Sequence, residues 1–398
     1  MAEQLPHPQA RRSFLGAAAG LAMSALLAGC QIIPDPGAPQ TRAEPAPLPA
    51  PTPTLTPEPV QPAQDLRNKV AVLVPLTGEN AGVGRSIANA ANLALLDAGG
   101  ERIRITVYDT ARGAAAAANQ ALAEGNRLFL GPLLAEDVRA VAPVASRGGV
   151  PVVAFSNDVS VAGEGVYLLG FTPGQSVERV VGYARSQGLE RFAGLIPAGL
   201  YGQRSSQALI DAVEKAGGRM VAMQGYERSP ASLRAAVGRL SEQSGYDAVL
   251  IADASRIAAT AAPLIRSGPS SEARILGTEL WNTESNLSAQ VPLRGAWFAT
   301  VPDTMFDQLR GRYRTRYGTA PYRLASLGYD AVLMTIRIAA EWPFGRPFPA
   351  GKLRDPEGFV GLDGAFRFGR DGLAERALAV QQVTATGVET VSPAPEGF

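Results

Sequence analysis

Apolar runs alternate with amphipathic segments along the chain from residue 68 onward. The run KVAVLV at 69–74 shows no polar alternation, which is typical of a strand buried on both faces. The next segment, 82–98, places Ile87 and Leu95 on one helical face together with several alanines. The glycines at 99 and 100 predict the end of this helix. The pattern therefore predicts a strand followed by a helix.

The same alternation continues in two series. The first predicts strands at 102–108, 127–131 and 150–155 and helices at 111–124 and 135–146. The second predicts strands at 192–196, 218–224, 247–252 and 273–278 and helices near 177–184, 209–216, 231–243 and 256–267. A strand at 295–300, helices at 305–317 and 325–341 and a β-rich tail at 366–383 follow. Successive strand–helix units form right-handed parallel sheets with helices on both faces, so we predict an α/β fold with two doubly wound parallel-sheet lobes.

The chain is expected to pass between these lobes three times. The expected parts of lobe 1 are residues 68–172 and 296–365, and those of lobe 2 are 173–295 and 366–391. The expected hinge crossings lie near 171–174, near 293–296 and within 356–376.

The first 29 residues have a charged start and a short apolar core, which is too short and too rich in small residues for a membrane span. They predict an export signal. Its end, Leu27-Ala28-Gly29-Cys30, resembles the bacterial lipobox, which implies lipidation of Cys30 and attachment to a membrane. The stretch RRSFLG also resembles a twin-arginine signal, so the export route stays open. Gln31 favours the outer membrane by resemblance to a sorting rule, and the predicted location is the periplasm.

Residues 30–67 are predicted to be the lipidated cysteine and a linker. Residues 31–64 hold 11 prolines, which favour extended conformations. At about 3.1 Å per residue, this stretch could reach on the order of 100 Å. A passive spacer and a docking segment both fit this composition.

Composition narrows the possible chemistry. Apolar residues make up 46% of the chain and charged residues 18%, which suits a globular core, and the net charge of +1 creates no global field for nucleic acid. The single histidine, His7, lies in the predicted signal, and Cys30 is the single cysteine. After cleavage this excludes His/Cys zinc sites, Ser-His-Asp and Cys-His systems, and disulfides. Carboxylate pairs, Ser/Lys dyads and all-oxygen metal sites remain, but no lysine neighbours a strained serine turn. We expect a protein that is not an enzyme and has no cofactor.

Ligands of open parallel sheets bind beyond the carboxyl ends of the strands, and two lobes would place these ends across a cleft. Tyr201 and Trp281 could stack on a ligand or pack between loop and helix, and Glu279 could pair with an ammonium group or be solvated. The loop GENAGVGRS lacks the lysine of a phosphate-binding loop. The candidate cleft residues are Thr77, Gly78, Leu134, Ser156, Asn157, Tyr201, Asp253, Glu279 and Trp281.

Several of these segments resemble a known family. KVAVLVPLTGENAGVGRSIANAANLALLDAG and FLGPLLAEDVRAVAPVASRGGVPVVAFSN are similar to the leucine-binding class of type I periplasmic binding proteins, over roughly 68–391. LGTELWN, RGAWFATVPD, RYGTAPYRLASLGYDAVL and FVGLDGAFRFGRDGLAERALAV resemble lipoproteins known as penicillin-binding protein activators. The helical-repeat domain of the best-known activators is absent from this sequence, where the proline-rich segment precedes the fold.

The resemblance implies two functions. As an activator, the protein would contact a class A penicillin-binding protein, which is a peptidoglycan synthase. As a solute receptor of a branched-chain-amino-acid-type ABC transporter, it would bind an amino acid, whereas an activator cleft could hold a muropeptide. Receptors of this class hold the ligand carboxylate with a hydroxyl near the Gly-Pro turn and a later Ser/Thr, but Gly131-Pro132-Leu133-Leu134 has no hydroxyl and Ser156 matches only the second place. Glu279 matches the acidic residue that pairs with the ammonium group. The activator function is the main hypothesis.

Overall fold

Strand β1 (Asn68–Val74) lies in the first sheet between two hydrophobic cores. Val70 and Val72 point into one core, whereas Ala71 and Leu73 point into the other, and all four are fully buried. Helices cover both faces of this strand, so side chains on both faces must be apolar, which explains the uninterrupted apolar run. The computed structural model describes residues 66–243, 245–283 and 287–397, so the expected signal, Cys30 and most of the linker lie outside the described residues.

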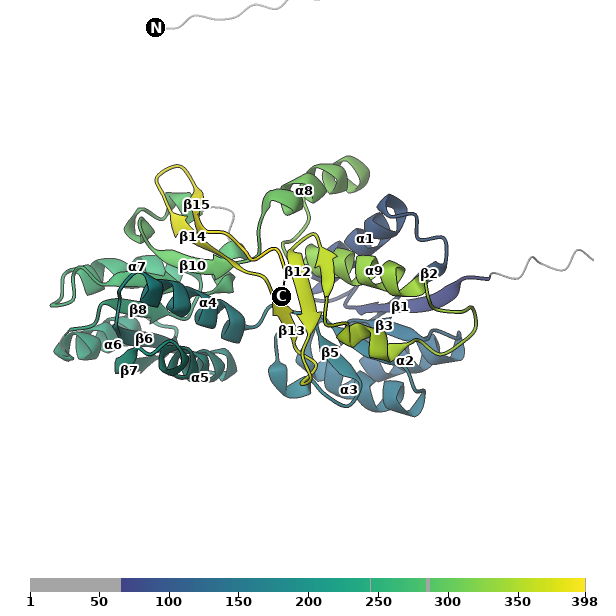
Figure 1. The fold of residues 1–398 in the computed structure, drawn as a ribbon. Helices are drawn as coiled ribbons and strands as arrows, with labels where there is room; N and C mark the ends of the chain where they lie inside the picture. Colours follow the sequence, from purple (N-terminus) through teal and green to yellow (C-terminus); the bar gives the residue numbers. More distant parts are fainter. Residues whose placement is uncertain (1–65, 244, 284–286, 398) are drawn as a thin grey trace, which may run out of the picture. The chain divides into compact units, whose positions relative to one another are not determined.

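The first sheet has five parallel strands in the order β2-β1-β3-β4-β5. Helices of the first core cover one face, and α2 and α3 cover the other (Figure 1). The strands are β2 (Ile103–Asp109), β3 (Leu128–Leu130), β4 (Val152–Ala154) and β5 (Val166–Leu168). The helices on the first face are α1 (Ala81–Asp97), α8 (Thr304–Tyr317) and α9 (Ala325–Ala339), and those on the second are α2 (Ala114–Ala123) and α3 (Ala135–Arg147).

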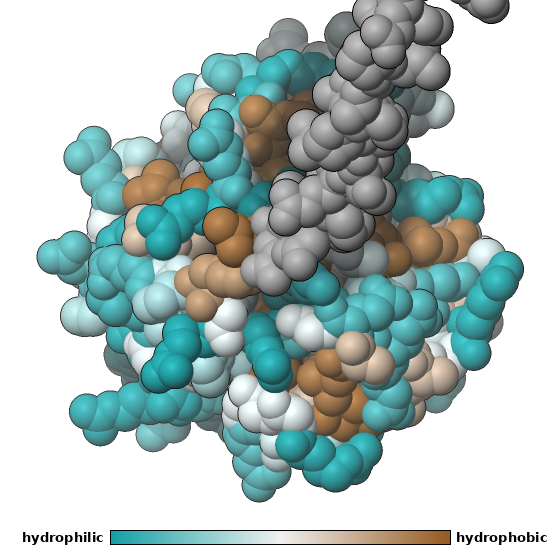
Figure 2. All heavy atoms as spheres, turned by 90° about the vertical axis from the view of Figure 1, so that its right-hand side faces the viewer, coloured by the Kyte–Doolittle hydropathy of each residue, from teal (hydrophilic) through white to brown (hydrophobic). Residues whose placement is uncertain are grey.

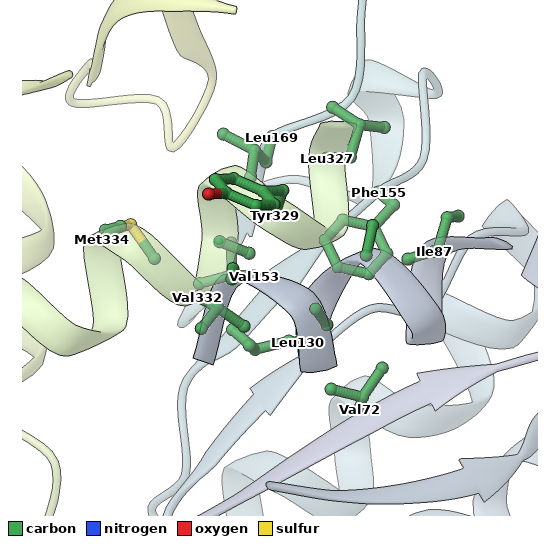
Figure 3. Close-up of a cluster of buried hydrophobic side chains, with 14 of the residues drawn as sticks. Val72, Ile87, Leu130, Val153, Phe155, Leu169, Leu327, Tyr329, Val332 and Met334 are labelled. Atoms are coloured by element: carbon green, nitrogen blue, oxygen red, sulfur yellow. The ribbon is translucent and has the colours of Figure 1, made fainter. Parts of the chain in front are cut away.

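Helices α1 and α9 pack tightly over this sheet. Figure 3 shows Ile87 of α1 and Val332 of α9 among the side chains of the core, together with Val72 of β1. At Gly328 of α9, an added Cβ would lie 2.4 Å from the carbonyl oxygen of Ile87. The two helices therefore approach to backbone contact at this glycine.

The second sheet has seven strands in the order β15-β14-β10-β9-β8-β6-β7. The strands from β7 to β10 are parallel, and β14 and β15 continue the sheet in antiparallel pairing. Its strands are β6 (Arg191–Pro197), β7 (Arg219–Tyr226), β8 (Ala248–Ile251), β9 (Arg274–Gly277), β10 (Trp297–Thr300), β14 (Ala379–Val383) and β15 (Val388–Ser392). Helices α4 (Pro173–Ser186) and α5 (Leu200–Lys215) pack on one face, and α6 (Pro230–Glu242) and α7 (Ser255–Arg266) pack on the other. The predicted α/β class with doubly wound parallel sheets is confirmed.

A small antiparallel sheet and several 3-10 turns complete the described fold. The small sheet has the order β11-β12-β13, and its strands are β11 (Phe359–Gly361), β12 (Gly364–Phe368) and β13 (Ala374–Arg376). The 3-10 turns are η1 (Thr110–Arg112), η2 (Val159–Val161), η3 (Glu279–Thr283), η4 (Leu287–Ala289), η5 (Val291–Leu293) and η6 (Ala350–Arg354). Among the described residues, no helix combines the length and apolarity needed to cross a bilayer.

The expected division into lobes differs from the structure in two places. Residues 296–300 were expected in lobe 1, but β10 pairs with β9 and β14 of the second sheet. Residues 366–376 were expected in lobe 2, but Phe366 and Phe368 are buried in the first core. An apolar run predicts a strand but does not identify the sheet that accepts it. We therefore place the three crossings near residues 171–172, 301–302 and 376–377.

Candidate functional site

The loop after β1 is organised by Asp109 at the end of β2. The carboxylate of Asp109 accepts hydrogen bonds from the backbone nitrogen of Leu76 and from Oγ1 of Thr77, both at 2.8 Å. Burial alone would raise the pKa of Asp109, but these hydrogen bonds lower it below its usual value. Gly78 follows with a φ of 74°, a conformation that favours glycine. The structure therefore uses Thr77 and Gly78 to shape their own loop.

The other candidates from this sheet follow β3 and β4. Leu134 is half-buried and precedes helix α3. Ser156 is buried, and its Oγ accepts a hydrogen bond of 3.1 Å from the backbone nitrogen of Asp158. Asn157 is exposed. The hydroxyl of Ser156, which the family resemblance assigned to a ligand, is thus already bonded to the chain itself.

Asp158 is a functional candidate that sequence reasoning missed. Its carboxylate forms an ion pair with Arg204 of α5 and a second one, of 2.9 Å, with Arg139 of α3. Burial opposes the charge on Asp158, but hydrogen bonds from Ser160 and Arg204 outweigh it and lower the pKa to about 2. Arg204 lies one helical turn after Tyr201, so the helical spacing could have indicated that both face the same side. This ion pair links the loop after β4 to a helix of the second sheet.

Glu279 and Tyr201 lie in direct contact within the second lobe. The hydroxyl of Tyr201 lies 3.0 Å from Oε1 of Glu279, and Oγ of Ser176 donates to Oε2. The same Tyr201 hydroxyl lies 2.9 Å from Oγ1 of Thr278. Burial raises the pKa of Glu279, which these hydrogen bonds only partly offset. Both carboxylate oxygens therefore have partners within the second lobe.

Asp253 and Trp281 stabilise the second core. Trp281 is fully buried, and its Nε1 donates a hydrogen bond of 2.9 Å to the carbonyl oxygen of Asp253. The indole lies against Gly277, where an added Cβ would come within 2.4 Å of the ring. The carboxylate of Asp253 accepts from the hydroxyl of Tyr226 at 2.8 Å and from Nε of Arg228 at 3.1 Å. The expectation that Trp281 offers a face to a ligand is corrected, because its ring packs between loop and sheet.

A narrow cavity with about 360 Å³ of empty volume lies where the three crossings meet. Phe171, Val301 and Leu378 contribute its apolar lining, one from each crossing. Glu279 reaches it from the second lobe, and Arg323 reaches it from the segment before α9. It therefore combines apolar walls with charges of both signs, in a space that admits a group of about the size of a water molecule.

A buried cluster of two arginines and two aspartates adjoins this cavity. Nη2 of Arg376 donates to the carbonyl oxygen of Leu169 at 2.7 Å, while Nε and Nη1 have no hydrogen-bond partner. Nη1 lies 3.8 Å from Asp330, and Arg323 lies 2.9 Å from Asp363. Burial and the charge of Asp363 both raise the pKa of Asp330. The arginines balance two carboxylates that would otherwise repel each other.

These contacts define what the site can do chemically. The predicted cleft residues do not converge on one pocket: Glu279 lines the cavity, Trp281 lies in the core, and Thr77 shapes a loop. Within the ranges that the structure describes, no group of three or more His, Cys, Asp or Glu side chains is placed to hold a metal ion. The arrangement therefore offers charge recognition and hydrogen bonding.

A protein-family model described as "Periplasmic binding protein" matches residues 68–388 of the chain. Among curated proteins, an uncharacterized protein of Rickettsia prowazekii is 24% identical over 178 residues. That match covers 44% of this chain and 48% of the relative, so it spans about half the length of the relative.

Solved structures of two kinds share the fold. A protein assigned to a branched-chain amino acid ABC transporter of Rhodospirillum rubrum has a TM-score of 0.71 at 20% identity, and the match covers 82% of this chain and 100% of that one. The C-domain of LpoA from Haemophilus influenzae, described as a regulator of PBP1A, has a TM-score of 0.65 at 19% identity over 81% of this chain and 100% of that one. Full-length LpoA from the same organism has a TM-score of 0.64 at 19% identity, and the match covers 82% of this chain but 59% of that one. At these identities the likeness establishes the fold.

Proposed function

Because the chain belongs to the periplasmic binding protein family, we propose that it is a non-enzymatic regulator that binds a peptidoglycan synthase, as a penicillin-binding protein activator would. The proposed partner is a class A penicillin-binding protein, and the proposed anchor is the lipid on Cys30. This proposal places the protein in the periplasm, attached to the outer membrane.

One observation carries the preference for a regulator over a receptor. Glu279, the residue that would pair with the ammonium group of an amino acid, has both carboxylate oxygens within hydrogen-bonding distance of side chains of its own lobe, Tyr201 and Ser176. Each oxygen thus already accepts from one hydroxyl, which leaves fewer acceptor positions at Glu279 for a ligand ammonium group. At the carboxylate end of such a site, Ser156 accepts a backbone hydrogen bond, and Gly131-Pro132-Leu133-Leu134 supplies no second hydroxyl.

Two further features support the regulator. The segments LGTELWN, RGAWFATVPD and RYGTAPYRLASLGYDAVL resemble activator lipoproteins. The matched region also spans the whole LpoA C-domain, a protein described as a regulator of PBP1A. These features make contact with a synthase of that class the first candidate activity.

The second candidate is a solute receptor of a branched-chain-amino-acid-type ABC transporter. It is favoured by the TM-score of 0.71 with the Rhodospirillum rubrum protein and by the cavity that Glu279 shares with Arg323. In that case the lobes would close on the ligand and signal to a permease.

Purified class A synthase and branched-chain amino acids separate the two candidates. The regulator should bind the synthase in a pull-down and should show no thermal stabilisation by micromolar leucine, isoleucine or valine. Glu279→Gln is the matched control, because it keeps the shape of the side chain but removes its charge. The variant should leave synthase binding unchanged. Stabilisation of the native chain by leucine, lost in Glu279→Gln, would instead establish the receptor.

A further inference from the structure

The first sheet begins with a row of positive side chains, at the edge opposite the carboxyl ends of its strands. Lys69 of β1 and Arg104 of β2 are register partners, so their side chains lie on the same face. Arg127, which precedes β3, donates its backbone nitrogen to the carbonyl oxygen of Lys69 at 3.0 Å and is level with it. Like charges side by side on neighbouring strands are destabilising. The fold therefore keeps three positive side chains next to one another, an arrangement whose mutual repulsion lowers stability.

These cations line a hollow of about 840 Å³ together with Arg67. The four positive residues share this lining with Asn68, Gly125, Phe344 and Gly345, and no acidic residue belongs to it. The four cations contrast with the net charge of the whole chain, which is only +1. The pairing of strands therefore brings basic residues together locally, which the nearly neutral composition of the whole chain does not indicate.

The hollow has a wall that is held in place by hydrogen bonds. Nδ2 of Asn68 donates to the carbonyl oxygen of Trp342 at 3.0 Å, and the backbone nitrogen of Gly345 donates to Oδ1 of Asn68 at 3.3 Å. Nε1 of Trp342 donates to the carbonyl oxygen of Arg346 at 2.9 Å. The 342–346 loop is thus fixed against β1, and the hollow is formed before any ligand arrives.

The acidic side chain of Glu124 interacts with two of these cations, Lys69 and Arg104. Its carboxylate accepts from the hydroxyl of Tyr108 at 2.7 Å and from Nε2 of Gln120 at 2.9 Å. These hydrogen bonds, and then the charges of Lys69 and Arg104, lower the pKa of Glu124. Glu124 therefore offsets part of the positive charge of Lys69 and Arg104.

Exposed apolar side chains stand beside the cations. Leu66 is 65% exposed and precedes Arg67, and Phe344, which lines the hollow, is 51% exposed. Figure 2 faces the side of the molecule where β1 and β2 begin, and hydrophilic side chains project there beside hydrophobic patches. Cations next to exposed apolar groups suit the interface of an anionic bilayer. The described part of the chain begins at Leu66, and Arg67, which follows it, lines this hollow.

We infer that Arg67, Lys69, Arg104 and Arg127 form a binding site for the phosphate group of an anionic lipid headgroup. The positive side chains hold the phosphate, and Leu66 and Phe344 enter the apolar boundary of the bilayer. The lipid on Cys30 would hold the chain at a membrane surface, and this site would orient the first lobe against it. The inference is independent of the synthase or receptor function.

Vesicle co-sedimentation tests the site, with Cys30→Ala in every protein so that no acyl chain contributes. The test variant is Arg104→Gln/Arg127→Gln. The matched control, Arg234→Gln/Arg256→Gln, changes two exposed arginines of the second lobe and alters the net charge equally. Each cation at an anionic surface contributes about fivefold to binding, so the test variant should bind phosphatidylglycerol vesicles about 25-fold more weakly. The control should bind as the parent protein does.

The lipid composition and a soluble anion complete the test. Vesicles of phosphatidylcholine should bind weakly, and added salt should weaken binding to phosphatidylglycerol. Phe344→Ser should weaken binding without changing the salt dependence. Equal binding by the test and control variants would overturn the site. Inorganic phosphate that stabilises the parent protein but not Arg104→Gln/Arg127→Gln, with no vesicle binding, would show a receptor for soluble phosphate and overturn the lipid assignment.

Discussion

Asp158 and Arg204 form an ion pair that joins the loop after β4 to helix α5 of the second sheet. Asp158 retains only 6% of its side-chain exposure, and Arg204 retains 18%. An ion pair at this depth is costly to break on one side, because the remaining charge stays buried. Asp158 and Arg204 thus couple the two lobes through a partly desolvated contact.

Asp158→Asn should lower the free energy of unfolding at pH 7 by about 2 kcal/mol. The folded pKa is lowered to about 2, so the charged form stabilises the protein above the unfolded pKa of about 4. This stability is lost as the pH falls from about 4 through about 2, and the variant should lack that loss. Urea unfolding at pH values between about 2 and 4 measures this loss of stability in the parent protein and in the variant. Arg139→Gln is the control, because Arg139 is 55% exposed, and a loss as small as the control's would contradict the prediction.

Glu279→Gln should be at least as stable as the parent protein at pH 7, with a gain on the order of 1 kcal/mol. Burial raises the folded pKa of Glu279 above its unfolded value, so stability is lost as the pH rises from about 4 through the folded pKa. The amide removes that loss and can donate to Ser176, whose hydroxyl also has Pro173 as an acceptor at 3.1 Å. Thermal unfolding across this pH range measures the effect.

Glu279→Ala is the contrasting variant. It leaves the hydroxyls of Tyr201 and Ser176 without their carboxylate partner, which should cost about 1–3 kcal/mol. If Glu279→Gln is as damaging as Glu279→Ala, the carboxylate charge itself is required for stability, which contradicts the prediction for Glu279→Gln.

The periodicity of apolar residues predicts most of this fold because both sheets are covered on two faces. Strand β1 and helix α9 could be read from the sequence, since buried strands and amphipathic helices leave repeating patterns. The lobe that accepts β10 could not be read, because its four buried residues pair through the backbone with strands on either side. Strand β5 has three residues, too few to produce a recognisable alternation.

The candidate site was predictable only in part. The rule for strand ends located the loops of Asp109, Asp158 and Glu279, because topology fixes where those ends lie. The rule did not show which of these side chains bond or pack within the protein and are therefore not available to a ligand. Trp281 follows a strand as a cleft residue would, yet its Nε1 finds a buried acceptor at Asp253 and its ring enters the core. Whether a side chain faces the cleft or packs in the core depends on contacts between residues far apart in sequence, which a sequence pattern does not show.

Cys30→Ala should release the protein from the membrane fraction. The expected lipid supplies the anchor, and the basic hollow at β1 would contribute only a weaker, salt-dependent attachment. Fractionation in high salt therefore measures the anchor alone. If the variant stays with membranes in high salt, lipid attachment at this cysteine is not what holds the protein there. Arg104→Gln/Arg127→Gln with Cys30 intact is the control and should remain in the membrane fraction.

Arg376→Gln should destabilise the protein by about 3–5 kcal/mol, because it leaves the buried carboxylate of Asp330 without its cation, while Arg323 still pairs with Asp363. Arg367→Gln on the neighbouring strand is the matched control. Arg367 pairs with Glu375 at 2.7 Å and is 37% exposed, so its loss should cost less than about 1 kcal/mol. Urea midpoints compare the two variants. A similar cost for both would show that the buried cluster does not depend on Arg376.

Gly328→Ala should destabilise the protein by about 1–3 kcal/mol, since the new methyl group would overlap the carbonyl oxygen of Ile87 and force α1 and α9 apart. Gly311→Ala in α8 is the matched control, because an added Cβ there meets nothing within 4 Å. That substitution should stabilise the protein by about 0.5–1 kcal/mol through helix propensity. Denaturant midpoints with unchanged m-values measure both effects. A stabilising Gly328→Ala would mean that the two helices do not meet at Ile87 as the first core requires.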